Sequence, residues 1–160
     1  MLQIRPFLPA DAAGVIALVL PIQQAEFGLA VTLADQPDLA DIAGFYQRGQ
    51  GNFWVATADG AVVGSIGWLD IGDDQGALRK MFVARGWRGP AHGVARQLLD
   101  GLLAWATARR FGTAWLGTTE HFQAAHRFYA RNGFAEIART ALPARFPVMA
   151  VDTRFFRRQL

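Results

Sequence analysis

The chain has 160 residues, a hydrophobic fraction of 52% and no cysteine, which predicts a single globular domain over residues 1–160 and excludes disulfides and cysteine metal sites. The formal net charge is +3, and all but one of the 16 basic residues are arginines, spread along the chain rather than gathered in a stripe that would bind nucleic acid. The apolar stretch at residues 14–22 contains Pro21 and is too short to span a bilayer, so we expect a cytoplasmic protein with no membrane partner.

Hydrophobic periodicity and turn signals predict a succession of strands and helices. Strands are expected at residues 2–7, 52–58, 61–71, 78–83, 113–119, 134–137 and 147–156, and helices at residues 12–27, 36–46, 94–106 and 121–132. Asp11 is expected to cap the first helix, Asp59-Gly60 to form the turn of a hairpin, and Gly133 to end the last helix. This order predicts a mixed α/β (α+β) fold with one largely antiparallel central sheet flanked by helices.

The segment Ala84–Ala106, ARGWRGPAHGVARQLLDGLLAWA, changes from an arginine- and glycine-rich turn to an apolar helical pattern. The open N-terminus of a helix has unpaired backbone N–H groups and the positive end of the helix dipole, and both attract an anion such as a phosphate. Gly89 and Gly93 would let the backbone approach such a ligand closely. The motif of a Walker loop and the glycine fingerprint of a dinucleotide site are both absent. A glycine-rich turn that only starts a helix is the alternative.

Several stretches, taken with the order of the elements, resemble the GNAT superfamily of acyl-CoA-dependent N-acyltransferases. They are the opening IRPFLPAD, the hairpin end VVGSIGW, the strand LRKMFV before RGPAHGVARQLL, and the late AAHRFYARNGF. In this family a loop of the form Gln/Arg-x-x-Gly-x-Gly/Ala binds the pyrophosphate of acetyl-CoA. The residues from Gly93 to Leu99 match its second half, whereas Pro90 stands at its first position and Arg88 lies two residues earlier.

The resemblance implies acetyl-CoA as co-substrate and assigns it two stretches of the chain. In the family a β-bulge splays the strand that here contains Met81–Val83, so that its backbone binds the pantetheine arm. One N–H of this strand would also polarise the thioester carbonyl. Arg79, Lys80 and Arg85 suit the phosphates, although a solvated basic rim has the same pattern. The expected cofactor-binding residues are Met81, Phe82, Val83, Arg88, Gly89, His92, Gly93, Val94, Ala95 and Arg96.

Phe122, Ala125 and Tyr129 recur on one face of the predicted helix at residues 121–132. The resemblance gives Tyr129 the role of the catalytic acid that protonates the departing thiolate of coenzyme A. A phenol with an ordinary pKa of about 10 keeps its proton at neutral pH and can donate it. A buried packing residue is the alternative. The family often has Asn seven residues before this tyrosine, where the chain has Phe122.

The acceptor side is expected along QQAEFGLAVTLADQPDLADI and TALPARFPVMAVD, the segments that wall the amine site in the resembling family. Glu26 is the catalytic residue expected to meet the amine, and Asp35 and Asp38 could also bind it or relay its proton. Each of these could equally be a surface or helix-terminal carboxylate. His121 and His126 could accept an amine proton. The scattered histidines predict no metal site.

The sequence therefore predicts an N-acetyltransferase that moves an acetyl group from acetyl-CoA to a primary amine of a small molecule or peptide. The amine would attack directly, without a covalent enzyme intermediate. A non-catalytic acyl-CoA-binding module of the same fold is one alternative, and a basic nucleic-acid-binding protein is a weaker one. No nucleic acid, metal or membrane partner is expected, and a homodimer is left open.

Overall fold

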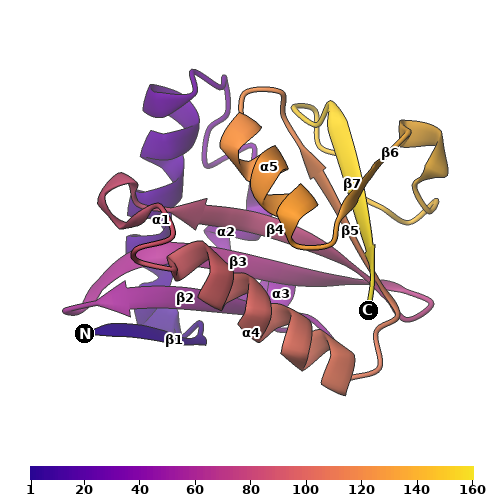
Figure 1. Ribbon diagram of the computed structural model, residues 1–160. Helices are drawn as coiled ribbons and strands as arrows, with labels where there is room; N and C mark the ends of the chain where they lie inside the picture. Colours follow the sequence, from indigo (N-terminus) through magenta and orange to yellow (C-terminus); the bar gives the residue numbers. More distant parts are fainter.

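The centre of the molecule is a seven-stranded sheet in the strand order β1-β2-β3-β4-β5-β7-β6 (Figure 1). The computed structural model describes residues 1–160. The strands are β1 (Leu2–Pro6), β2 (Asn52–Ala58), β3 (Ala61–Gly72), β4 (Gln75–Val83), β5 (Thr113–Thr118), β6 (Ala135–Ile137) and β7 (Arg154–Gln159). Every neighbouring pair is antiparallel except β4 and β5, which run parallel. The predicted mixed, largely antiparallel sheet flanked by helices is therefore confirmed.

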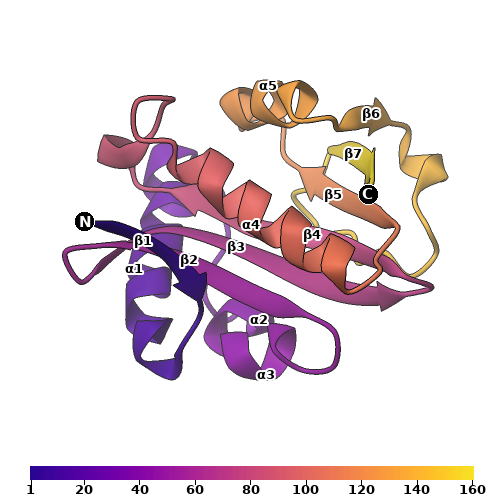
Figure 2. The same ribbon diagram turned by 60° about the horizontal axis from the view of Figure 1, so that its bottom comes forward.

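Helices cover both faces of this sheet (Figure 2). They are α1 (Ala12–Pro21), continued by a π-helical turn at Ile22–Glu26, then α2 (Pro37–Ala40), α3 (Ile42–Tyr46), α4 (Val94–Ala108) and α5 (Gln123–Arg131). The helices α1, α2 and α3 contribute to one apolar cluster, and α4 and α5 contribute to another on the opposite face. The apolar spacing in α4 explains its position, because Val94, Leu98 and Leu102 are buried against the sheet. None of the helices is long and apolar enough to cross a bilayer.

Turn residues that adopt left-handed backbone conformations set the strand ends. Asp59 and Gly60 have φ angles of 51° and 82°, which confirms the predicted hairpin turn between β2 and β3. Gly133 has a φ angle of 85° after α5, also as predicted. Asp73 and Asp74, with φ angles of 56° and 58°, form a second hairpin that the sequence analysis missed. Because of this hairpin, β4 begins at Gln75 rather than at the predicted residue 78.

The first helix reaches Glu26, close to the predicted end at residue 27, but its cap and its last turn differ from the prediction. The carboxylate of Asp11 does not cap α1. It instead accepts a hydrogen bond from the Leu8 N–H at 2.8 Å and two from Arg5 at 2.7 and 2.9 Å. At the other end Pro21 does not stop the helix. The hydrogen bonds continue with π spacing, from the Phe27 N–H to the Ile22 carbonyl, because the proline nitrogen cannot donate and the backbone ladder shifts around it.

Two further predicted elements were wrong in extent. The helix expected at residues 36–46 is divided into α2 and α3 at Asp41, whose carboxylate caps α3 by accepting a hydrogen bond from the Gly44 N–H at 3.0 Å. The strand expected at residues 147–156 begins only at Arg154. Before it, Asp152 accepts a hydrogen bond from the Met149 N–H at 2.9 Å, and this local turn competes with strand pairing.

Candidate active site

The strands β4 and β5 lie side by side only at their beginnings. Parallel pairing joins residues 75–77 to residues 113–115, and beyond them the two strands diverge (Figure 1). Burial changes at the same place, because Gly76 to Leu78 are buried whereas all residues from Arg79 to Val83 are partly exposed. On the side of β5, the backbone of Arg79–Val83 therefore has no strand partner. We call this stretch the open edge of β4.

A β-bulge lies within the open edge. The register between β3 and β4 shifts between Ser65 and Gly67, which pair with Phe82 and Arg79. At the shift Lys80 has a φ angle of 52°, and its carbonyl accepts a hydrogen bond from the Ser65 hydroxyl at 2.7 Å. Left-handed conformations are uncommon for residues other than glycine, and bulges often re-aim side chains next to active sites. Of the expected cofactor-binding residues, Met81 lies within this bulge, and Phe82 and Val83 follow it directly.

The chain leaves β4 through a turn that ends at the N-terminus of α4. Gly89 and Gly93 have φ angles of 98° and 65°, and Gly93 is the N-cap residue of α4, which no side chain caps. In the first turn of the helix, the N–H groups of Val94, Ala95 and Arg96 have no acceptor in the protein. A Cβ atom at Gly89 would meet nothing within 4 Å, so this surface is open. The turn has the geometry of an anion cradle.

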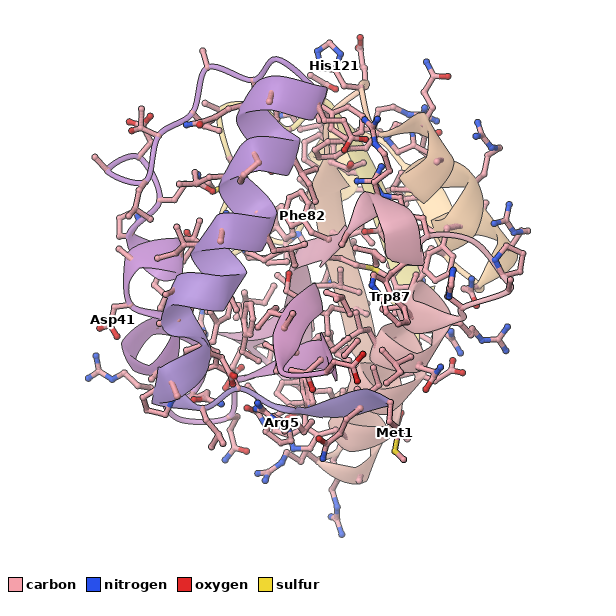
Figure 3. All side chains as sticks on the ribbon, turned by 90° about the vertical axis from the view of Figure 1, so that its left-hand side faces the viewer. Met1, Arg5, Asp41, Phe82, Trp87 and His121 are labelled. Atoms are coloured by element: carbon pink, nitrogen blue, oxygen red, sulfur yellow. The ribbon has the colours of Figure 1, made fainter.

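Two other expected cofactor residues, Arg88 and His92, belong to the same turn. The ring of His92 lies 5.1 Å from that of Trp87 (labelled in Figure 3). The guanidinium of Arg88 is engaged within the protein. Its Nε donates to the Val83 carbonyl at 2.9 Å, and its two terminal nitrogens donate to the Glu26 carboxylate at 2.6 and 2.8 Å. Arg88 therefore joins the turn both to the open edge and to the end of the first helix.

This ion pair also determines the state of Glu26. Hydrogen bonds from Arg88 hold the pKa of Glu26 below its ordinary value, although desolvation acts in the opposite direction. Each carboxylate oxygen of Glu26 accepts a hydrogen bond from Arg88, so the pair favours the charged form of this carboxylate. The two residues are 62 positions apart, and no sequence pattern predicted their pairing. The expectation that Glu26 acts on the acceptor stays a prediction.

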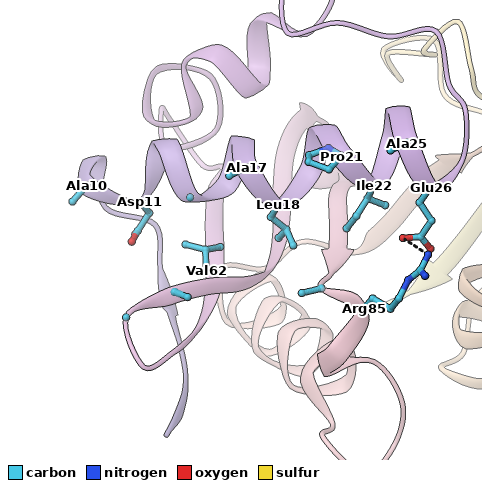
Figure 4. Close-up of a pocket in the computed structure, with 14 residues that line it drawn as sticks. Ala10, Asp11, Ala17, Leu18, Pro21, Ile22, Ala25, Glu26, Val62 and Arg85 are labelled. Carbon is cyan, nitrogen blue, oxygen red and sulfur yellow. Dashed lines mark ion pairs between the residues drawn. The ribbon is translucent and has the colours of Figure 1, made fainter.

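A cleft of about 760 Å³ adjoins the same region, between α1 and the hairpin of β2 and β3 (Figure 4). Its wall on the helix side consists mostly of apolar residues of α1, and Glu26 and Arg85 lie at one end. None of the residues of the open edge lines it. The cleft is therefore a neighbour of the cofactor turn and is separate from the open edge.

Tyr129 projects from α5 toward the open edge. Its hydroxyl donates a hydrogen bond to the sulfur of Met81 at 3.7 Å and makes no other. Its ring packs against Phe134 and Phe156, with centroids 5.6 and 5.9 Å away. Burial raises the pKa of Tyr129 far above its ordinary value, so the phenol keeps its proton. Since a thioether is a weak acceptor, this hydroxyl is available to a better acceptor beside β4.

Phe122, which stands where the resembling family often has Asn, lies in an aromatic cluster. Its ring packs edge-on against Phe27 and Phe82, with centroid distances of 4.6 and 6.0 Å. Phe82 also packs against the apolar cluster of α1 (Figure 3). The cluster thus joins three separate parts of the chain by apolar contact beside the open edge.

The two histidines near α5 differ in their environments. His126 is buried, with Nε2 2.9 Å from the Thr119 carbonyl and Nδ1 2.7 Å from Arg154. Because a guanidinium only donates, Nδ1 must accept and Nε2 must carry the proton. Burial and the charge of Arg154 lower the pKa of His126, so it stays neutral and neither nitrogen is free. His121 lies exposed at the surface (Figure 3), and no His, Asp and Glu side chains form a group of three that could hold a metal ion.

The two aspartates expected on the acceptor side also differ. Asp35 accepts two hydrogen bonds from Thr32 in an exposed turn. Asp38 is only 2% exposed. Its Oδ2 accepts a hydrogen bond from the Tyr46 hydroxyl at 2.6 Å and lies 3.4 Å from the Lys80 Nζ. Asp38 is therefore part of a buried polar cluster that reaches the open edge through Lys80.

A third carboxylate, Asp152, was not singled out by the sequence analysis. The only signal was an acidic residue ending the segment TALPARFPVMAVD. Asp152 packs over Gly117 of β5, where an added Cβ would lie 2.6 Å from its Oδ2. Burial raises the pKa of Asp152, although Arg79 and Lys80 act against this shift. A carboxyl group with a raised pKa is better suited than Glu26 to exchange a proton near neutral pH.

The chain is similar in sequence to known proteins. A family model described as acetyltransferase (GNAT) family matches residues 18–134. N-acetylaspartate synthetase of Danio rerio is 35% identical over 105 residues, which are 64% of this chain and 36% of that protein. The chain spans about a third of the length of the N-acetylaspartate synthetases it matches and just under half of two other N-acetyltransferases.

The fold is also similar to solved structures. A GNAT-family acetyltransferase from Staphylococcus aureus Mu50 has a TM-score of 0.95 at 34% identity, with 99% of both chains covered. The PaiA N-acetyltransferase from Thermoplasma acidophilum, solved in complex with coenzyme A, has a TM-score of 0.78 at 14% identity, with 100% of this chain and 99% of that chain covered. At that identity the second likeness shows the fold alone.

Replacement of Glu26 by glutamine tests the ion pair with Arg88. Because this pair is partly exposed, Glu26→Gln should lower the free energy of unfolding by about 1 kcal/mol at pH 7. The folded chain has the lower pKa, so the stabilisation is present above the unfolded value of about 4.3 and is lost as the pH falls through the folded value. The difference in melting temperature between variant and parent should therefore shrink below about pH 4.

The matched control is Glu120→Gln, at an exposed glutamate that forms no ion pair. Thermal unfolding of the three proteins at pH 7 and at acidic pH is the measurement. Equal melting temperatures for both variants at pH 7 would contradict a stabilising role for the pair.

Proposed function

This chain belongs to the GNAT family of acetyltransferases, and on that premise we propose that it uses acetyl-CoA as donor and the primary amine of a small molecule or peptide as acceptor. One observation carries the proposal: the open edge of β4 runs directly into the uncapped N-terminus of α4. A single segment thus offers strand-like backbone pairing followed by an anion cradle. Acetyl-CoA requires both in this order, because the amides of its pantetheine arm lie between the thioester and the pyrophosphate.

The residues of this segment divide between the two parts of the donor. We assign the pyrophosphate to the free N–H groups of Val94, Ala95 and Arg96, next to the left-handed Gly93. The backbone of Met81–Val83 would hold the pantetheine arm. Arg88 and His92 would shape the turn, and the bonds of Arg88 to Val83 and Glu26 would hold that turn in place.

The chemical step is direct attack of the amine nitrogen on the thioester carbonyl carbon. A C–N bond forms, the C–S bond breaks, the nitrogen loses a proton and the sulfur leaves as a thiolate. Holding amine and thioester in contact supplies much of the rate enhancement. A backbone N–H of the open edge would stabilise the negative charge that develops on the carbonyl oxygen.

Two side chains are suited to move the protons in this step. The phenol of Tyr129 is protonated, faces Met81 of the open edge and has no strong acceptor of its own, so we assign it the protonation of the thiolate. Asp152 lies beside β5, across from the open edge, and burial raises its pKa. We assign it the proton that the acceptor ammonium must lose before attack.

The curated relatives support an acceptor amine carried by an amino acid. Their name, N-acetylaspartate synthetase, identifies aspartate as the acceptor in those proteins. This chain matches about a third of their length. An amino acid is therefore the first acceptor to try.

Gly93→Val tests the anion cradle. The substitution puts a β-branched side chain on a residue with a φ angle of 65°, and both strain and bulk disturb the N–H groups of the first turn of α4. The Kd for coenzyme A, measured by calorimetry, should rise about tenfold or more. Gly49→Val is the matched control, because Gly49 has a φ angle of 60° in an exposed loop away from the turn. Folded parent protein that binds neither acetyl-CoA nor coenzyme A at millimolar concentration would refute the proposal.

Tyr129→Phe tests the catalytic acid. The ring packing is kept and only a weak bond to sulfur is lost, so the melting temperature should change little. Loss of a general acid costs about a hundredfold to ten-thousandfold in rate, and we expect kcat to fall near the lower end because a thiolate is a good leaving group. Steady-state release of free thiol is the measurement. A near-parental kcat would make Tyr129 a packing residue.

Asp152→Asn tests the proton acceptor. A base acts only when deprotonated, so the kcat/KM of the parent should rise with pH through the raised pKa of Asp152, and the variant should lose this ascending limb. The rate should fall about a hundredfold. Asp74→Asn is the control, since Asn also tolerates the left-handed turn that Asp74 occupies. An unchanged pH profile for Asp152→Asn would exclude it as the base.

A further inference from the structure

The β-bulge of β4 turns two neighbouring cations to the same face of the sheet. Successive side chains of a regular strand alternate between faces, but at the bulge Arg79 and Lys80 both approach Asp38, at 3.7 and 3.4 Å. Their side chains are only 11% and 8% exposed. Burial of charge is costly unless each group is paired, and unusual backbone conformations of this kind concentrate at functional sites. The partners of each cation therefore show how its buried charge is compensated.

Lys80 has strong partners within the protein. Its Nζ donates to the side-chain oxygen of Gln36 at 2.7 Å and faces the Oδ2 of Asp38. Gln36 is held in place by reciprocal hydrogen bonds with Gln23, both 2.9 Å long. The same Oδ2 of Asp38 accepts the Tyr46 hydroxyl. This part of the cluster is satisfied without a ligand.

Arg79 is not satisfied in the same way. One terminal nitrogen lies 3.1 Å from the thioether sulfur of Met149, and its distance of 3.7 Å from Asp38 exceeds a hydrogen bond. The guanidinium also lies 5.5 Å from the centroid of the Phe45 ring. A guanidinium has five N–H donors and prefers two oxygens of one carboxylate, whereas a thioether is a weak acceptor. Arg79 is therefore a largely buried cation without an anion of its own.

The remaining charged groups nearby do not supply that anion. Asp152 interacts electrostatically with Arg79 and Lys80, but it forms an ion pair with neither, and one of its oxygens is bound to the Met149 N–H. Arg139 also acts on Asp152 and adds positive charge. At ion-pair distance, two buried cations share a single oxygen of Asp38. Within ion-pair distance the two cations are therefore short of one negative charge, because Asp38 is the only carboxylate that lies so close.

We propose that a carboxylate of the acceptor supplies this charge by binding Arg79, so that the acceptor is an amino acid with its amine and carboxylate on one small molecule. The proposal rests on the proposed function and names its substrate class. Arg79 begins the open edge of β4, so a carboxylate held there leaves the amine of the same molecule close to that edge. Bidentate binding would also orient the amine for attack.

The experiment compares pairs of amines that differ only in a carboxylate. The probes are L-alanine against ethylamine and L-aspartate against β-alanine, with acetyl-CoA as donor and thiol release as the readout. The parent protein should prefer the more carboxylated member of at least one pair by about tenfold to a hundredfold in kcat/KM. A second readout is the thermal shift that each amino acid causes in protein saturated with coenzyme A, which reports binding without turnover.

Variants of Arg79 test whether this side chain binds the carboxylate of the acceptor. Arg79→Gln should raise the KM for the preferred amino acid about tenfold to a hundredfold, abolish its thermal shift and leave the KM for acetyl-CoA unchanged. Arg79→Lys keeps the charge but not the two parallel donors, and should give an intermediate KM. Arg48→Gln, at an exposed arginine after α3, is the matched control and should behave like the parent.

The outcomes separate this proposal from the proposed function. Absence of coenzyme A binding in the folded parent protein would overturn the proposed function and, with it, this proposal. Coenzyme A binding without a preference for carboxylated amines and without an amino acid thermal shift would overturn this proposal alone. An Arg79→Gln protein with the parental melting temperature and parental amino acid KM would do the same.

Discussion

The early end of the pairing between β4 and β5 is the constraint on which the rest of the site depends. Backbone N–H and C=O groups in the middle of a sheet are normally paired, because leaving them without partners costs free energy. Here the pairing stops after Ala77, and the second half of β4 keeps its β3 neighbour only through a bulge. The bulge, the turn and Tyr129 all take their positions relative to this open edge.

Most charged side chains around the open edge have partners within the protein, which the side chains of a solvated basic rim would lack. Arg88 holds the end of the first helix through Glu26, and Lys80 is bound to Gln36 and Asp38. Only Arg85, with a side chain 78% exposed, fits the alternative of a solvated cation. The arginines near the turn thus fix the walls of the site, and the free backbone amides of α4 remain for an anion.

Local signals account for the parts of the fold that could be predicted. The hairpin at Asp59-Gly60 and the end of α5 at Gly133 depend on residues that tolerate left-handed backbone, and such residues are visible in a sequence. Apolar spacing likewise predicted the buried face of α4. The missed hairpin has Asp73 and Asp74 rather than glycine at its two central positions. The division between α2 and α3 depends on the Asp41 side chain, which caps α3 where a continuous helix was expected.

The sequence by itself determined the order of the elements, the glycine turn before α4 and the resemblance that led to the family and to the position of Tyr129. Only the tertiary structure decided which charges meet. Glu26 pairs with Arg88 across 62 positions, and Arg79 and Lys80 reach the same aspartate because the bulge at Lys80 breaks the alternation of the strand. The physical reason is one of range. Turn and helix preferences act over a few residues, whereas an ion pair depends on distances that exist only once the sheet has formed and β4 has separated from β5.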